Sequence, residues 1–194
     1  MSEFKILFYD TETSGFLQKG AEKLPAIEQP WIVQMGMILT DGETDFHRMS
    51  FMINSIDREI SPGAEKVHGI SREMTKNGIS ELMAAAILSR MLTNADLLVC
   101  HNVAFDIPMT ALMYRRIGEE NDALRIEKFP SLCTMKETAD FCAIPTKWGK
   151  PKWPKLEELE KKLFGFCMEG AHDALNDCEK TRKCYFELKE RKIL

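Results

Sequence analysis

The sequence predicts an α/β protein in which helices flank a central mixed β-sheet. Residues 4–10 and 47–54 alternate apolar and polar side chains, and residues 31–40 form a nearly continuous apolar run, so three strands are expected first. Apolar residues then recur at helical spacing from Ile79 to Met91. A meander of three strands followed by alternating helices and strands is typical of a mixed sheet.

The second half of the chain predicts further alternation. Residues 96–100 form a short apolar strand pattern, and a helix is expected to follow it to about Ile117. Another short strand is expected near 131–135, then helices near 154–164 and from about 173. We find no internal repeat, low-complexity tract or linker in this order.

Composition favours one soluble domain over residues 1–194, because 44% of its 194 residues are hydrophobic and 29% are charged. Neither a signal peptide nor a membrane span is expected. The six cysteines have no zinc or redox spacing, which favours reduced cysteines in a cytoplasmic protein. A net charge of −4 argues against a protein that coats nucleic acid electrostatically, but it suits an enzyme that binds anions through metal ions.

Two acids extend the apolar row of the first strand. In "FYDTETSG", Asp10 and Glu12 are two residues apart, so a strand places both on the face of Ile6 and Phe8. This is the carboxyl end of the strand, where sheets of this class often bind ligands. The alternative is that the strand ends at Tyr9 and a polar turn follows.

A third acid follows the strand at 96–100. In "CHNVAFD", Asp106 is expected close to a helix N-terminus, because Pro108 is favoured in a first helical turn. The alternative is an ordinary acid that stabilises the helix dipole, with His101 and Asn102 as cap and turn residues.

A fourth acid lies on the last helix, in "AHDALNDCEK". Asp177 falls within a stripe of inward positions at helical spacing, and a buried aspartate normally needs a partner. His172 stands five residues before it. The stripe comprises Ala174, Asp177, Cys178, Thr181, Tyr185 and Leu188.

Gathering four carboxylates would be unfavourable without cations. Two of them about 4 Å apart repel by roughly 4 kcal/mol at an effective dielectric near 20. Oxygen ligands suit Mg²⁺ or Mn²⁺, and two such ions are a known arrangement for hydrolysis of a phosphodiester. Asp177 is therefore expected to bind metal, and His172, neutral near pH 7, to accept the proton of the attacking water.

The motifs "DTETSG", "HNVAFD" and "HDALND", in this order, resemble those of the DEDDh (DnaQ-like) family of 3′–5′ exonucleases. Members include the epsilon subunit of DNA polymerase III and ribonuclease T, and the resemblance covers essentially the whole chain. It implies a ribonuclease H-like fold, two divalent metal ions, either Mg²⁺ or Mn²⁺, and release of nucleoside 5′-monophosphates.

The resemblance also implies residue roles. Asp10 would bridge both metals, Glu12 and Asp177 would hold the metal that activates water, and Asp106 would support the other. Matching positions that contact the 3′-terminal nucleotide in relatives are Thr13, Phe16, His68, Asn102 and Phe105. For Phe105 a place in the core is the alternative, and for His68 a capping role.

Two loops look particular to this chain. Residues 16–30 form a long polar connection, which is either a rim over the site or a tolerated surface loop. Residues 146–155 interleave four lysines with Trp148 and Trp153, which suits stacking on single strands. A solvated loop whose tryptophans cap the core is the alternative.

The sequence therefore predicts a metal-dependent 3′–5′ exonuclease that acts on single-stranded nucleic acid, with DNA favoured over RNA. Alternatives are an exoribonuclease like ribonuclease T and a non-catalytic nucleic-acid-binding or polymerase-accessory module. The chain ends 17 residues after Asp177, which favours a free-standing nuclease over a subunit tethered by a C-terminal tail. A DNA polymerase partner stays an alternative, no membrane association is expected, and the pattern does not predict the oligomeric state.

Overall fold

The computed structural model describes residues 4–17, 25–54, 58–147, 149–170 and 172–194, and its centre is a five-stranded mixed sheet. The strand order is β3-β2-β1-β4-β5; β1 pairs antiparallel with β2 and parallel with β4. The strands are β1 Ile6–Thr13, β2 Ile32–Thr40, β3 Asp45–Met52, β4 Leu97–Cys100 and β5 Ser131–Cys133. The predicted mixed sheet is confirmed.

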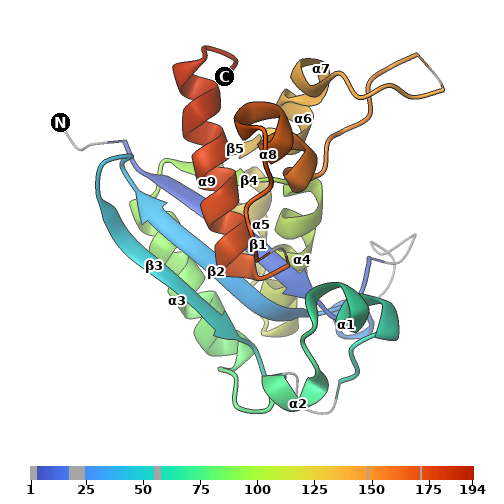
Figure 1. The fold of residues 1–194 in the computed structure, drawn as a ribbon. Helices are drawn as coiled ribbons and strands as arrows, with labels where there is room; N and C mark the ends of the chain where they lie inside the picture. The colour runs from blue at the N-terminus through green and yellow to red at the C-terminus, as the bar shows by residue number, and fades with distance from the viewer. Residues whose placement is uncertain (1–3, 18–24, 55–57, 148, 171) are drawn as a thin grey trace.

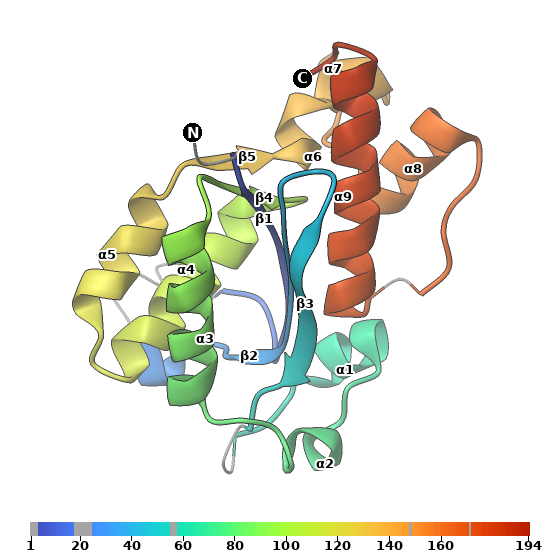
Figure 2. The ribbon, with the colours of Figure 1, turned by 90° about the vertical axis from the view of Figure 1, so that its left-hand side faces the viewer.

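Helices cover both faces of the sheet (Figures 1 and 2). Figure 2 shows α3, α4 and α5 on one face, with α9 and α8 on the other. The helices are α1 Pro62–His68, α2 Arg72–Thr75, α3 Glu81–Asn94, α4 Val103–Arg116, α5 Glu120–Lys128, α6 Thr134–Glu137, α7 Ala139–Cys142, α8 Leu156–Phe164 and α9 Ala174–Glu190, with a 3₁₀ turn, η2, at Ala26–Glu28.

The alternation of β1 divides its side chains between two cores. Leu7 and Tyr9 join the core beneath α3 and α4. Ile6 and Phe8 pack on the other face against α9, where the ring of Phe8 meets that of Tyr185 edge-on at 5.5 Å between centroids. Burial of these apolar side chains holds α9 against β1. Asp10 and Glu12 continue the face of Ile6 and Phe8, so they point toward the start of α9.

The expected order of strands and long helices is confirmed, with differences at the boundaries. β1 continues to Thr13, so the alternative of a polar turn after Tyr9 is wrong. α4 begins at Val103, which leaves Asp106 in its first turn as expected but moves Pro108 into the second. We did not predict α5, in which only Ala123 and Ile126 are buried.

Two expectations from composition can be compared with the fold. All six cysteines are free thiols, and Cys167 is the exposed one. Among the described helices, none is long and apolar enough to cross a membrane.

Candidate active site

The four predicted carboxylates converge in one cavity of about 460 Å³. Asp10 and Glu12 reach it from the end of β1, and Asp106 from the first turn of α4. Asp177 and His172 reach it from the start of α9 and the loop before it. Carboxylate oxygens of Glu12 and Asp177 and a ring nitrogen of His172 lie within 4.8 Å of one another. The three motifs, far apart in sequence, therefore form one site.

Burial and mutual repulsion make the acids of this cavity hard to ionise. The pKa of Asp10 is raised well above its ordinary value, first by burial and then by the charges of Asp106 and Asp177. Burial and the same two neighbours raise the pKa of Glu12 to about 8. Burial also raises the pKa of Asp106 to about 7, although hydrogen bonds from Thr11 oppose the shift. A bound cation would relieve this repulsion.

The raised pKa values predict how stability depends on pH. Between pH of about 4.5 and 8, folded Glu12 keeps a proton that the unfolded chain has lost, so the free energy of unfolding should fall as pH rises. In thermal melts without metal, we expect the melting temperature to fall across this range, and less steeply in Glu12→Gln. Manganese binds the deprotonated acids, so the rise in melting temperature that it causes should grow with pH. Identical pH profiles for the two proteins would contradict this reading.

Asp106 is fixed by hydrogen bonds from β1. The backbone N–H and the hydroxyl of Thr11 both donate to its Oδ1 atom, at 3.1 and 2.8 Å. One turn along α4, the hydroxyl of Thr110 donates to the backbone carbonyl of Asp106 and also contacts the Tyr9 hydroxyl at 2.8 Å. This network ties the second motif to the strand that carries the first.

Two residues of β2 dock the third motif. The side chain of Gln34 donates to Asp173 Oδ2 at 2.8 Å and accepts from the backbone N–H of Ala174 at 3.1 Å. Gly36, paired with Asp10 across the sheet, lets the backbone of α9 approach so closely that a Cβ atom there would lie 2.3 Å from the carbonyl carbon of Ala174. The lack of a side chain at Gly36 therefore brings α9 close to Asp10.

Gly36→Ala should push the start of α9 away from β1, because backbone atoms at 2.3 Å cannot be accommodated by a side-chain rotation. We expect a lower melting temperature and loss of most cleavage and of the manganese-induced stabilisation. Gly63→Ala is the matched control, since a Cβ atom there meets nothing within 4 Å. Wild-type activity in Gly36→Ala would show that the close approach is dispensable.

His172 is held in an uncommon backbone conformation beside Asp177. Its φ is +63°, in the left-handed region, and its backbone N–H donates to Asp177 Oδ2 at 3.2 Å. Its side chain is exposed at the cavity. Such strained residues often occur at functional sites, where the surrounding structure maintains them.

The residues expected to contact the nucleotide fall into two groups. Phe16, Asn102 and Phe105 line the cavity, and the rings of the two phenylalanines meet edge-on at 6.1 Å. Phe105 also packs against the core. Thr13 and His68 are not among the described residues that line it; the carbonyl of Thr13 contacts Nε2 of His68 at 3.1 Å.

Residues 153–157 form another wall of the cavity. Trp153 is 55% exposed there, with the ammonium of Lys136 5.5 Å from its ring centroid. The next residue is anchored, because Nε2 of His101 donates to the carbonyl of Pro154 at 3.0 Å. Burial lowers the pKa of His101 to about 4, so this anchor stays neutral. Trp148 lies outside the described residues.

Three residues near the acids were not among the sequence predictions: Gln34, Gly36 and Lys180. A polar residue and a glycine inside the nearly continuous apolar run at 31–40 were signals that could have found the first two. Lys180 carries no such signal, because a lysine on a long helix is ordinarily a solvated residue.

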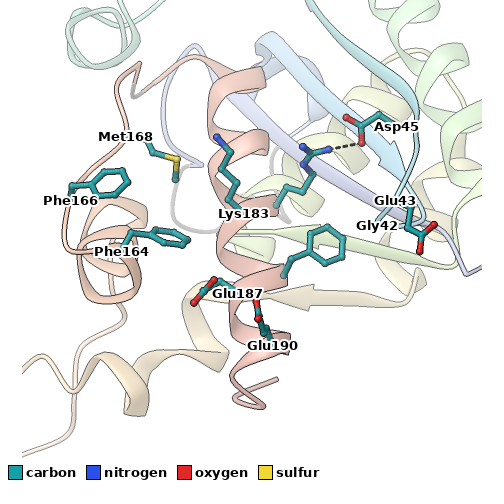
Figure 3. Close-up of a pocket in the computed structure, with 11 residues that line it drawn as sticks. Gly42, Glu43, Asp45, Phe164, Phe166, Met168, Lys183, Glu187 and Glu190 are labelled. Carbon is teal, nitrogen blue, oxygen red and sulfur yellow. Dashed lines mark hydrogen bonds and ion pairs between the residues drawn. The ribbon is translucent and has the colours of Figure 1, made fainter.

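A larger cavity, of about 720 Å³, lies against α9 elsewhere on the molecule (Figure 3). It is bordered by Phe164, Phe166 and Phe186 together with charged residues. Asp45 there is paired with Arg182. None of its described lining residues is a histidine or belongs to the acidic cluster, so the smaller cavity is the candidate site.

The fold matches solved structures of Escherichia coli exonuclease I. The complex with a dA16 oligonucleotide gives a TM-score of 0.74 at 23% identity, over 97% of this chain and 41% of that chain. The zinc-bound form of its single-stranded DNA complex gives 0.76 at 23% identity, over the same shares. At this identity the likeness shows the fold, and this chain spans about two-fifths of the length of those proteins.

Two further comparisons concern the sequence itself. No curated protein matches the chain significantly. The model of the RNase_T family, described as exonuclease, matches residues 7–185, which include all three motifs of the site. The chain therefore belongs to the RNase_T family of DnaQ-like exonucleases, which are hydrolases.

Proposed function

We propose that this chain is a metal-dependent 3′–5′ exonuclease that releases nucleoside 5′-monophosphates from the ends of single-stranded DNA. The observation that carries the proposal is the convergence of four carboxylates and a histidine in one cavity. Membership of an exonuclease family supports hydrolysis of a phosphodiester as the reaction. A non-catalytic binding module would have no use for a base beside clustered acids.

The residues of the cavity fit two divalent cations, Mg²⁺ or Mn²⁺. Oxygen ligands suit these ions, and the buried acids repel one another in the absence of cations. Asp10, Glu12, Asp106 and Asp177 would hold them. When bound, such ions activate the attacking water and stabilise the leaving oxygen of the phosphodiester.

Three parts of the chain would perform the remaining tasks. His172, exposed at the cavity and fixed beside Asp177, takes the proton of the attacking water. Phe16 and Phe105 offer aromatic surface for the 3′-terminal base, with Asn102 beside them. Thr13 and His68 would support this subsite from β1 and α1.

Single-stranded DNA is the favoured substrate. Exposed aromatic side chains on two walls of the cavity suit unpaired bases, which can stack on them. Exonuclease I of E. coli, which shares the fold, has been solved with single-stranded DNA. An exoribonuclease is the alternative, because contacts to a 2′-hydroxyl depend on details of the pocket. A DNA polymerase partner stays an untested alternative.

Trp153→Ala should weaken binding of single-stranded DNA by about 1–3 kcal/mol, the usual scale for loss of one stacked base. Because Trp153 is 55% exposed, folding should change little. The measurement is binding of a fluorescent oligonucleotide with Ca²⁺ in place of Mn²⁺. Phe166→Ala is the control, since that ring is exposed at the other cavity. A lower melting temperature without a binding defect would support a core role for Trp153.

The substrate is tested by matched oligonucleotides of single-stranded DNA, duplex DNA and RNA, each with Mn²⁺ or Mg²⁺, with products separated by size. We expect single-stranded DNA to be shortened fastest, by one nucleotide at a time. Faster loss of RNA would establish the exoribonuclease instead. Dominant internal cuts would contradict the assignment of an exonuclease.

A further inference from the structure

The metal cavity contains a buried cation of its own. The ammonium of Lys180, on the second turn of α9, lies 3.4 Å from Oδ1 of Asp177 and its side chain is only 3% exposed. It lines the same cavity as the catalytic acids. Burial of a lysine ammonium is unfavourable unless opposite charge compensates it, so Lys180 is held here by the acids.

A second buried acid lies behind this pair. Glu160, on α8, is 0% exposed, and neither of its carboxylate oxygens is paired with a described side chain; a backbone contact with Met168 favours its ionised form. α8 packs beside α9 through Leu159, Leu163 and Leu188 (Figures 1 and 2). The pKa of Glu160 is raised, and burial is the largest cause. The charge of Asp177 also raises it, whereas the charge of Lys180 lowers it. Glu160 is therefore within electrostatic range of both partners.

A buried carboxylate without a cationic partner is uncommon in folded proteins and calls for an explanation. Lys180 is the described cation that acts on Glu160 in the structure, yet its ammonium is paired with Asp177 instead. A lysine side chain has a flexible four-carbon stem, so its ammonium can move while its backbone stays in place. Glu160, buried and without a cationic partner among the described residues, is the acid that could receive that ammonium.

Metal binding at Asp177 would leave the ammonium of Lys180 in need of another partner. A divalent cation held by Glu12 and Asp177 would lie close to the ammonium of Lys180, and like charges repel strongly at such distances. Lys180 and the metal therefore compete for Asp177. This step rests on the proposed function, because it takes the acidic cluster to be a metal centre.

We propose that Lys180 is a positioning residue with two partners. In the metal-free protein its ammonium is the counter-ion of Asp177, and when a divalent cation binds Asp177 the lysine side chain moves so that its ammonium pairs with Glu160. The exchange keeps Asp177 compensated at every stage. It also lowers the affinity for metal, because the ion must displace a bound cation. Glu160 offsets part of that loss by receiving the ammonium.

Substitutions on the two sides of this exchange should act in opposite directions. Lys180→Met removes the competitor, so Mn²⁺ should bind at least tenfold more tightly than to the wild type. Glu160→Gln removes the receiving charge, so Mn²⁺ should bind several-fold more weakly. Lys180→Arg keeps the positive charge and should stay closer to the wild type than Lys180→Met. If Lys180 were only a scaffold for Asp177, its removal would weaken binding.

The experiment is a titration of the protein with Mn²⁺, read by calorimetry and by the shift in melting temperature, without nucleic acid. Because Lys180→Met leaves Glu160 buried without a cation, the double variant Glu160→Gln/Lys180→Met is included. Once the ammonium of Lys180 is absent, Glu160→Gln should not change Mn²⁺ affinity further. The double variant should therefore bind Mn²⁺ as tightly as Lys180→Met. Lys183→Met is the control, since it removes the same charge from α9 at a side chain that is 52% exposed.

The outcomes separate this inference from the proposed function. If wild type binds Mn²⁺ and Asp10→Ala does not, the metal centre stands and the variants decide the role of Lys180. Weaker or unchanged binding by both Lys180→Met and the double variant would then overturn the counter-ion exchange alone. If Asp10→Ala binds Mn²⁺ as the wild type does, the metal centre fails, and the exchange fails with it.

Discussion

Asp10→Ala should abolish cleavage and remove most of the stabilisation by manganese. Asp10 lies in the middle of the acidic cluster, since the charges of Asp106, Asp177 and Glu12 all act on it. At a metal concentration 100 times the dissociation constant, binding to the folded state adds about 2.7 kcal/mol to the free energy of unfolding. The variant should lose most of this increment, which thermal melts with and without Mn²⁺ measure directly.

Without metal, the same variant should show the opposite effect on stability. Without metal, Asp10→Ala should be no less stable than the wild type above neutral pH, because it removes one of several acids that repel one another. Asp140→Ala, at an exposed acid on α7, is the control and should keep both activity and the manganese effect. An equal manganese shift in Asp10→Ala and wild type would place the ions elsewhere.

His172→Ala should slow cleavage by about 10²–10⁴-fold, the usual contribution of a positioned general base. Metal binding should change far less, because the four carboxylates remain. The measurement is single-turnover cleavage of single-stranded DNA at saturating Mn²⁺, with the metal affinity measured separately. Saturating metal matters because the acids also titrate, with the pKa of Glu12 raised to about 8.

The dependence of this rate on pH gives an independent test of the base. The rates of wild type and His172→Ala are measured across the same pH range at saturating Mn²⁺, and the two profiles should differ, because only the wild type has an imidazole to accept the proton. If the variant kept near wild-type rates and the same profile, the proton would be taken by another group.

The succession of strands along the chain and the face of β1 that carries the first two acids could be predicted, because both follow from local pattern. The alternation of β1 sets which way Asp10 and Glu12 point, since period-2 geometry holds for any strand. The recurrence of apolar residues at helical spacing likewise predicts that Asp177 lies near the inward face of α9. Its side chain is 16% exposed, at the edge of that face beside the cavity.

The contacts that assemble the site could not be predicted in the same way. The docking of α9 depends on Gly36 and Gln34, which lie nearly 140 residues before Ala174 in sequence. His101 contacts Pro154 from a distant loop. Lys180 has one neighbour on its own helix, Asp177, but its other acidic neighbour, Glu160, belongs to α8. Such long-range approaches depend on how the elements pack, which hydrophobic periodicity does not specify.

The most direct test of the central claim is the polarity of cleavage. Single-stranded DNA labelled at its 5′ end is incubated with the protein and Mn²⁺, either with a free 3′ end or with a chemically blocked one. We predict a ladder that shortens one nucleotide at a time from the free 3′ end, nucleoside 5′-monophosphates as products, and protection by the block. Early release of the 5′ label, or equal loss of the blocked substrate, would contradict a 3′–5′ exonuclease.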